Sequence, residues 1–394
     1  MTADSSFQSF LAREVREGSR YHTAPRVIEG PQAHKVRVDG RDVIMLSSNN
    51  YLGLTTHPRV IKATKDAIDR YGVGLGCGRS IASMRIQLDL EERLAKFKHT
   101  EATLAFATGY DTNLGTVWAL MDRGTTLFLD EYNHASVFDG AGLSGARVRV
   151  YPHRDMRKLE SFLKTPDRNK RRFIITPSIF PLEGDIAELP EIVELAERYG
   201  ASVYVDDAHA AGILGDHGRG SVDHFGLHGR VAVQVGTLSK ALASVGGYVA
   251  GSSDLREYLF WKARPFAIST GHLAPPSVAA VIASLDVLEE DDSLLKRLWK
   301  NADYFRGGLN DLGFDTGLSE TPIIPVVVKD AAKGARFSKT LLDQGILVRS
   351  FGPPTVPENT ARLRTIVSAT HSRAELDYAL ETFAKVGRSL EVIH

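Results

Sequence analysis

The chain of 394 residues has a single cysteine, no excess of either charge and no long apolar run. Cys77 cannot form a disulfide within the chain, so we expect a reducing compartment, the cytoplasm. No Cys/His ladder with zinc spacing is present either, and we therefore expect no metal site. Lysine and arginine total 48, as do aspartate and glutamate, and this balance argues against a nucleic-acid partner.

Long hydrophobic segments are also missing. No window approaches about 18 uninterrupted apolar residues, so we expect no membrane partner. The stretch from Met1 to Gly18 is charged and lacks the apolar core of a secretory signal, so we expect none. A chain of this length forms two domains, or one large α/β unit with an appendage.

What the chain does contain is an alternation of apolar β-branched runs with helical patterns. Continuous apolar runs are typical of strands covered on both faces, and their alternation with helices indicates a doubly wound, mostly parallel α/β domain. We predict an N-terminal arm over residues 1–46 with a helix around 7–17, a large α/β domain over 47–285, and a smaller α+β domain over 286–394. The strands predicted for the large domain are 103–107, 126–129, 147–151, 172–176, 201–205, 231–235 and 247–250.

The most informative stretch runs from Val235 to Gly247, where a predicted strand ends in small hydroxyl residues before Lys240. This lysine would lie at the carboxyl edge of a parallel sheet, where α/β folds bind ligands. Taken alone, such a lysine is more often a surface residue on a loop. One strand earlier, Asp206 and His209 follow an apolar run, and a buried carboxylate there is costly without a cationic partner.

Together these residues indicate pyridoxal phosphate (PLP) chemistry. That chemistry needs a lysine, an acid facing the ring nitrogen, a flat group over the ring and a phosphate cradle. Gly109 follows a predicted strand and opens a helix, whose backbone N–H groups attract phosphate. His134 is the candidate for the flat group, although a lone histidine is more often a helix cap or a core residue.

Seven blocks of the sequence resemble, in order, the α-oxoamine synthase family of PLP enzymes, and they cover the chain from about residue 20 to its end. Within that family, residues 49–51, 236–238 and 383–393 are most similar to 2-amino-3-ketobutyrate coenzyme A ligase (glycine C-acetyltransferase). The blocks are Ser48-Asn-Asn-Tyr-Leu-Gly-Leu54, Tyr132-Asn-His-Ala-Ser136, Val205-Asp-Asp-Ala-His209, Gly236-Thr-Leu-Ser-Lys240, Arg264-Pro-Phe266, Pro353-Pro-Thr-Val-Pro357 and Ala361-Arg-Leu-Arg364.

The resemblance implies a PLP-dependent enzyme of fold type I. It would condense an amino acid with an acyl thioester, of coenzyme A or a carrier protein, to give an α-amino ketone or a β-keto amino acid. Lys240 would bind PLP covalently and act as acid and base, and Asp206 would pair with the ring nitrogen. His209 would contact the ring hydroxyl, and His134 would stack on the ring.

The same resemblance implies the remaining contacts. Backbone N–H groups of Gly109 and Tyr110 would bind the phosphate, with the hydroxyl of Thr237. Arg364, a planar bidentate donor, would bind the amino-acid carboxylate with the help of Asn49. Residues of a second subunit would complete the phosphate site, which implies a homodimer with shared active sites. These residues are Ser269 and Thr270.

Two segments depart from the family pattern. Pro181 replaces a serine that helps to hold the substrate, and Ser178 is the candidate to compensate for it. Residues 76–87, at the expected mouth for the acyl thioester, lack a Gly-Thr pair and a histidine. We therefore expect an amino acid larger than glycine to be the better substrate.

Two alternatives stay open at this point. One is another fold type I enzyme, such as an aminotransferase or an aldolase/lyase. The other is a non-catalytic subunit of a heterodimer, against which Lys240 argues because such a subunit needs no PLP-binding lysine.

Overall fold

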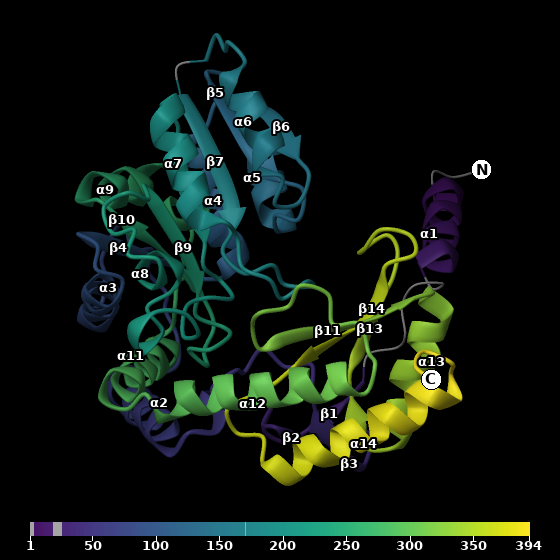
Figure 1. Ribbon diagram of the computed structural model, residues 1–394. Coiled ribbons are helices and arrows are strands. Elements are labelled where there is room, and N and C mark those ends of the chain that lie inside the picture. Colours follow the sequence, from purple (N-terminus) through teal and green to yellow (C-terminus); the bar gives the residue numbers. More distant parts are fainter. Residues whose placement is uncertain (1–3, 19–25, 170) are drawn as a thin grey trace.

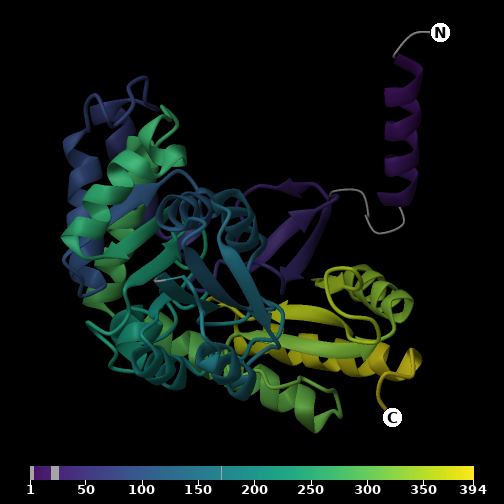
Figure 2. The ribbon, with the colours of Figure 1, turned by 90° about the horizontal axis from the view of Figure 1, so that it is seen from above.

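The computed structural model describes residues 4–18, 26–169 and 171–394. Residues 1–3 and 19–25 of the predicted arm lie outside the described part. The predicted helix of the arm is confirmed as α1, Asp4–Gly18. Figure 2 shows α1 standing away from the rest of the chain.

A seven-stranded sheet forms the centre of the larger part of the molecule (Figure 1). Its strand β10 runs antiparallel to both neighbours, and the other pairings are parallel. The predicted strands are all present, with ends shifted by at most two residues, and the α/β prediction is confirmed. In spatial order the strands are β4 (Ala102–Phe106), β10 (Gly247–Gly251), β9 (Val233–Thr237), β8 (Ser202–Asp206), β7 (Arg171–Pro177), β5 (Thr125–Asp130) and β6 (Arg147–Tyr151).

The central strands are covered on both faces, which explains their continuous apolar sequences. Every residue of β5 is buried, for example. Alternate residues of the strands enter different clusters, because successive side chains of a strand point to opposite faces. Leu127 packs with the helices α4 (Gly109–Leu120), α5 (Ala135–Ser144), α9 (Ser253–Lys262) and α10 (Arg264–Ala267). Phe128 packs with the helices α6 (Met156–Lys164), α7 (Leu189–Tyr199) and α8 (Ser221–His224).

Beside β4 and β10, one of three further helices packs directly on the two strands, the second packs on the first, and the third packs on the second. They share one apolar cluster with Ala105 and Tyr248 of the two strands. The helices are α2 (Pro58–Tyr71), α3 (Arg85–Phe97) and α11 (Pro275–Glu290), with the short helices η1 (Leu54–Thr56) and η2 (Asp216–Gly218) in the connecting loops.

Two small sheets and three helices form the other end of the molecule. The N-terminal strands belong to it, because β12 pairs in parallel with β3, and Ile44 and Leu46 pack into the apolar cluster of the C-terminal helices. The domain boundaries at residues 46 and 285 stay a prediction. One sheet contains β1 (Ile28–Glu29), β2 (Lys35–Val38), β3 (Arg41–Met45) and β12 (Ile346–Leu347). The other contains β11 (Ile323–Lys329), β14 (Ala361–Ile366) and β13 (Arg349–Phe351). The helices are α12 (Ser293–Asp311), α13 (Ala331–Asp343) and α14 (Arg373–Ser389).

Within the described ranges, no helix combines the length and the apolar character needed to cross a bilayer.

A buried ion pair fixes α3 to the carboxyl edge of the large sheet. Lys98 follows α3, and its Nζ donates to Asp207 Oδ2 at 2.8 Å and to the carbonyl of Arg219. The carboxylate of Asp207 also accepts hydrogen bonds from the backbone N–H and the hydroxyl of Ser221. Both charged side chains are almost fully buried, so each depends on the other for its charge compensation.

We predict that Lys98→Met lowers the free energy of unfolding by about 3–5 kcal/mol, because it leaves the Asp207 carboxylate buried and without its cation. Urea denaturation of the purified protein measures this change. The control is Lys62→Met, which breaks an exposed pair with Asp66 and costs at most about 1 kcal/mol. Equal effects of the two substitutions would contradict the importance of the buried pair.

Candidate active site

The predicted site residues converge where the carboxyl edge of the large sheet meets the smaller part of the chain. Asp206 ends β8, and Lys240 lies in the loop after β9. Arg364 comes from β14 on the other side, and Asn49 lies in the loop after β3. Segments that are more than 300 residues apart thus meet, because Arg364 Nη2 donates to Asn49 Oδ1 at 2.8 Å.

Lys240 carries an amine that is activated by its surroundings. Burial lowers the pKa of this ammonium from 10.5 to about 7, and the charge of Arg364 acts in the same direction. Asp206 opposes the shift. A large fraction of the amine is therefore neutral near pH 7, which is the form that can attack a carbonyl or remove a proton.

Asp206 is held in one orientation by two donors. Asn113 Nδ2 donates to its Oδ2 at 2.8 Å, and the backbone N–H of Ala208 donates to its Oδ1 at 2.9 Å. Tyr204 donates to Asn113 Oδ1 at 2.7 Å and so fixes the amide. Sequence reasoning missed Asn113 and Tyr204. Asn113 lies in the helix that begins at Gly109, but no spacing in the sequence indicates that it meets Asp206.

The start of α4 forms the predicted phosphate cradle. Thr108 caps this helix by accepting the N–H of Asp111 at 2.9 Å. A Cβ on Gly109 would lie only 2.9 Å from Thr237 Oγ1, so glycine lets the helix start approach the end of β9. Tyr110 is half-exposed, and its hydroxyl donates to Asp139. The cradle therefore joins the backbone of Gly109 to the hydroxyl of Thr237.

His134 caps α5 and also leaves its ring exposed at the site. Its Nδ1 accepts the N–H of Ser136 at 3.3 Å and lies 2.7 Å from the Ser136 hydroxyl. The ring of Tyr110 meets that of His134 edge-on, with 6.1 Å between their centroids. The helix-cap interpretation is thus correct for His134, and it leaves the face of the ring available to a flat ligand.

A buried tyrosine links His209 to Arg364, and sequence reasoning missed this role of Tyr51. Burial raises the pKa of Tyr51 to about 12, although Arg364 pulls it down. The hydroxyl therefore keeps its proton and lies 2.8 Å from His209 Nδ1. Burial lowers the pKa of His209 well below 6.5, and the neighbouring basic groups Lys240, Arg364 and His134 add to this shift. In the tautomer whose Nδ1 accepts from the Tyr51 hydroxyl, the neutral imidazole presents its Nε2–H as a donor.

Arg364 carries a buried donor without a partner. Its Nη2 is used by Asn49, whereas its Nε–H is buried and makes no hydrogen bond among the described residues. Burial also lowers the pKa of Arg364. An unsatisfied buried guanidinium N–H in a site that also holds Tyr51 and Lys240 suits the carboxylate of an amino acid.

Ser269 and Thr270 lie apart from this group, in the loop between α10 and α11. Ser269 Oγ accepts the N–H of Gly271 at 2.9 Å, and its carbonyl lies against Gly78. Their contact with the phosphate of a second subunit stays a prediction.

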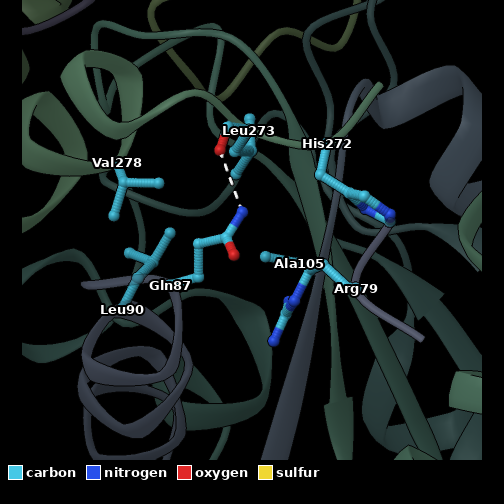
Figure 3. A pocket seen from close by; sticks show the side chains of 7 residues that line it. All are labelled: Arg79, Gln87, Leu90, Ala105, His272, Leu273 and Val278. Carbon is cyan, nitrogen blue, oxygen red and sulfur yellow. Dashed lines mark hydrogen bonds between the residues drawn. The ribbon is translucent and has the colours of Figure 1, made fainter. Parts of the chain in front are cut away.

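The unusual segment 76–87 packs against that same loop. Figure 3 shows the hydrogen bond from Gln87 to the carbonyl of Leu273, in a narrow pocket beside His272. The donor and acceptor atoms are 3.1 Å apart. Arg79 from the same segment forms a buried ion pair with Glu91 and lies over the ring of Phe266. Arg79 is therefore a structural residue that holds the segment to α3.

Ser178 does not compensate for Pro181 as a substrate donor. Its hydroxyl and its N–H both donate to the carbonyl of Asp206, at 3.1 and 3.0 Å. Its side chain is fully buried, because the strand β7 ends just before it against β8. Near Pro181, Glu183 accepts from Arg362 at 3.0 Å, so this guanidinium is already paired.

The donor set fits PLP: a neutral amine, a fixed carboxylate, an exposed flat ring and a helix start cleared by a glycine.

We predict that Asn113→Ala weakens PLP binding about 10- to 100-fold, because Asp206 loses a charge-assisted hydrogen bond worth about 1.5–3 kcal/mol. Titration of the dialysed protein with PLP, followed by visible absorption, gives the affinity. The control Tyr204→Phe leaves Asn113 in contact with Asp206 and has a smaller effect. Unchanged affinity in Asn113→Ala would show that the amide has no such role.

Comparison with known proteins agrees with this geometry. The model of the family "Aminotransferase class I and II" matches residues 41–383. The chain is 51% identical over 392 residues to the 8-amino-7-oxononanoate synthase of Thermoanaerobacter pseudethanolicus, with 99% of each chain covered. It is 50% identical over 369 residues to the enzyme of the same name from Symbiobacterium thermophilum, with 93% and 94% covered.

Solved structures show the same fold. The structure of SPT with the PLP internal aldimine has a TM-score of 0.93 and 31% identity, with 100% of both chains covered. The serine palmitoyltransferase of Sphingomonas wittichii has a TM-score of 0.93 and 30% identity, again over 100% of both chains. The 8-amino-7-oxononanoate synthase of Francisella tularensis has a TM-score of 0.76 and 26% identity, covering 89% of this chain and 99% of that one.

These findings confirm the predicted fold type, the cofactor and the reaction class. They favour the condensation of an amino acid with an acyl thioester over the aminotransferase and aldolase alternatives. The similarity to 2-amino-3-ketobutyrate coenzyme A ligase stays a prediction. The chain belongs to the aminotransferase class I and II family and, within it, to the α-oxoamine synthases, PLP-dependent enzymes that condense an amino acid with an acyl thioester.

Proposed function

We propose that this enzyme condenses alanine with a seven-carbon acyl thioester that ends in a carboxylate. The main support is the 51% identity to 8-amino-7-oxononanoate synthase over nearly the whole chain. The name of that product identifies the parts from which it is made. Its ketone carbon C7 and the carbons up to the C1 carboxylate make up the acyl group. C8 and C9 are a nitrogen-bearing carbon and a methyl group, which are alanine without its carboxylate.

The reaction balances with three products. The new bond joins the alanine Cα to the acyl carbonyl carbon, while the bond from that carbon to the thioester sulfur breaks. The alanine carboxylate leaves as CO₂, and the sulfur leaves as a thiolate that takes up one proton from solvent to become the free thiol. The thiol belongs to coenzyme A or to a carrier protein.

The residues of the site support this chemistry through distinct roles. PLP, when bound, accepts the electron pair that is left at Cα. We propose that Lys240 binds PLP and moves the Cα proton, because its pKa of about 7 lets it act as a base or an acid near neutrality. Asp206 would hold a proton on the ring nitrogen, His209 would donate to the ring hydroxyl, and His134 would cover the ring.

The carboxylate of the amino acid would bind between Arg364 and Asn49. The unpartnered Nε–H of Arg364 is the observation that carries this assignment. Because Pro181 donates no hydrogen bond, we propose that the side chain of the amino acid supplies part of the affinity. The methyl group of alanine supplies apolar contact that glycine lacks, in line with the preference expected from the sequence.

The test is a product assay by mass spectrometry with glycine, alanine and serine, each paired with acyl thioesters of different length. We predict 8-amino-7-oxononanoate from alanine and the heptanedioyl thioester, with kcat/KM for alanine at least about tenfold above glycine, since one methyl group is worth about 1–3 kcal/mol. Lys240→Ala serves as the inactive control. A higher kcat/KM with glycine would contradict the proposal and favour the activity of 2-amino-3-ketobutyrate coenzyme A ligase, which the sequence resembles.

We also propose that two copies of the chain form a homodimer with shared active sites, in the cytoplasm. Cys77 is an exposed free thiol, as expected in a reducing compartment. The loops near Ser269 and Thr270 expose the large apolar side chains of Ile81 and Ile268, each 81% exposed, and α9 exposes Trp261 at 58%. Exposed apolar side chains that gather on neighbouring loops are typical of a protein interface.

We predict that the double substitution Ile81→Glu and Ile268→Glu lowers the mass measured by light scattering toward 43.1 kDa, the mass of one chain, because it places charges in the interface. PLP affinity should fall with it, since Ser269 and Thr270 would no longer reach the second site. The matched control is Leu318→Glu, at a residue 72% exposed in the loop before β11. A wild-type protein of 43.1 kDa in solution would refute the shared site.

A further inference from the structure

Outside the active site, two histidines and an aspartate come together on the surface of the large domain. His99 follows α3, whereas Asp223 and His228 lie in and after α8. One ligand atom from each of the three side chains lies within 4.8 Å of the others. We propose that these residues form a binding site for a transition-metal dication of the Zn²⁺ class, which ties the end of α3 to the α8 segment.

The ligand atoms converge on one carboxylate oxygen. Asp223 Oδ1 lies 3.2 Å from His228 Nε2 and 3.9 Å from His99 Nδ1. The two imidazole rings are tilted by 47°, with centroids 5.0 Å apart. Small side-chain rotations would bring the two nitrogens and this oxygen within about 2.0–2.2 Å of a common ion.

The second oxygen of the carboxylate is already engaged, as in established metal sites. The backbone N–H of Asp216 donates to Asp223 Oδ2 at 2.7 Å, which leaves Oδ1 turned toward the histidines. A Cβ on Gly215 would lie 2.7 Å from that same Oδ2. Glycine at this position therefore makes room for the carboxylate in its present orientation.

The backbone of His99 supplies an independent argument. The N–H of Thr100 donates to the carbonyl of Ala95, and that of His99 to the carbonyl of Lys96, which is the Schellman pattern at the end of a helix. The residue at the position of His99 adopts left-handed backbone angles in this motif and is usually glycine, and here φ is 51°. A histidine in a glycine position has an unfavourable conformation, and a ligand role for its ring accounts for its presence.

The two chain segments that carry the site are both anchored to the buried carboxylate of Asp207. Lys98 precedes His99, and Ser221 lies two residues before Asp223, and both hydrogen-bond to the Asp207 carboxylate. The side chains of the site therefore project from backbone segments that are fixed relative to each other. Such rigid support is what a metal site requires before the ion arrives.

The ligand types select the metal. Two imidazoles and one carboxylate suit Zn²⁺ and its neighbours, whereas Mg²⁺ and Ca²⁺ prefer sets made of oxygen atoms. From the sequence we expected no metal site, because the chain has no Cys/His ladder with zinc spacing. His99 and His228 are far apart in the chain and form no such ladder. The fold alone brings them together.

Cobalt binding to the metal-stripped holoenzyme, without a polyhistidine tag, tests this site. We expect Co²⁺ to give visible d–d absorption at one equivalent per chain, and Zn²⁺ to displace it and raise the thermal midpoint. His228→Ala and His99→Gly should each weaken binding at least tenfold. His99→Gly is the sharper variant, because glycine suits the left-handed conformation, so its metal-free midpoint should be equal to or above that of the wild type.

The matched control is His224→Ala, which removes an exposed histidine from α8 that is not part of the cluster. It should bind Co²⁺ and Zn²⁺ as the wild type does. Co²⁺ affinity that is unchanged in His99→Gly and His228→Ala would overturn the proposal, as would the absence of saturable Co²⁺ binding in the wild type. Mg²⁺ that raises the midpoint as much as Zn²⁺ would also overturn it.

Discussion

Two successive buried carboxylates at the end of β8 are the constraint on which this structure depends. Asp206 is 6% exposed and Asp207 is fully buried, so each must be compensated nearby. Asp207 is paired with Lys98, which fixes α3 and the α8 segment against the sheet. Because Lys98 neutralises Asp207, it does not compensate Asp206. Asp206 instead accepts a hydrogen bond from Asn113 and interacts electrostatically with Lys240. A structural ion pair and a reactive carboxylate thus share one strand end.

Burial, together with the charges of neighbouring groups, explains the protonation states of the site. Lys240, Arg364 and His209 are three basic groups close together in a buried site, and they cannot all be charged at low cost. Arg364 keeps its charge because its intrinsic pKa is the highest. His209 is neutral, and Lys240 titrates near 7. The amine that has to react is therefore the one whose proton is most easily moved near neutral pH.

The fold was largely predictable because its signals are local. Apolar runs such as β5 marked the strands within two residues, and the carboxyl edge of a parallel sheet then located Lys240 and Asp206. Residues that act through contacts between distant segments were not predictable. Tyr51 meets His209 across 158 positions and Asn113 meets Asp206 across 93, and no period or spacing encodes such pairs. The roles of single residues are predictions from the family resemblance, and the expected help from Ser178 was wrong.

The unpartnered donor of Arg364 has an energetic consequence for substrate binding. A buried donor without an acceptor costs about 1–3 kcal/mol, and the folded protein bears this cost before the amino acid arrives. The cost is borne because β14 holds Arg364 through its backbone pairing with β11 and β13, independently of the site. A substrate carboxylate that accepts a hydrogen bond from Nε removes this free-energy cost. The cost that the free protein bears therefore adds to the affinity for the substrate. Since Asn49 and Arg364 come from opposite ends of the chain, that affinity also depends on the pairing of β3 with β12, which joins the N-terminal strands to the C-terminal part.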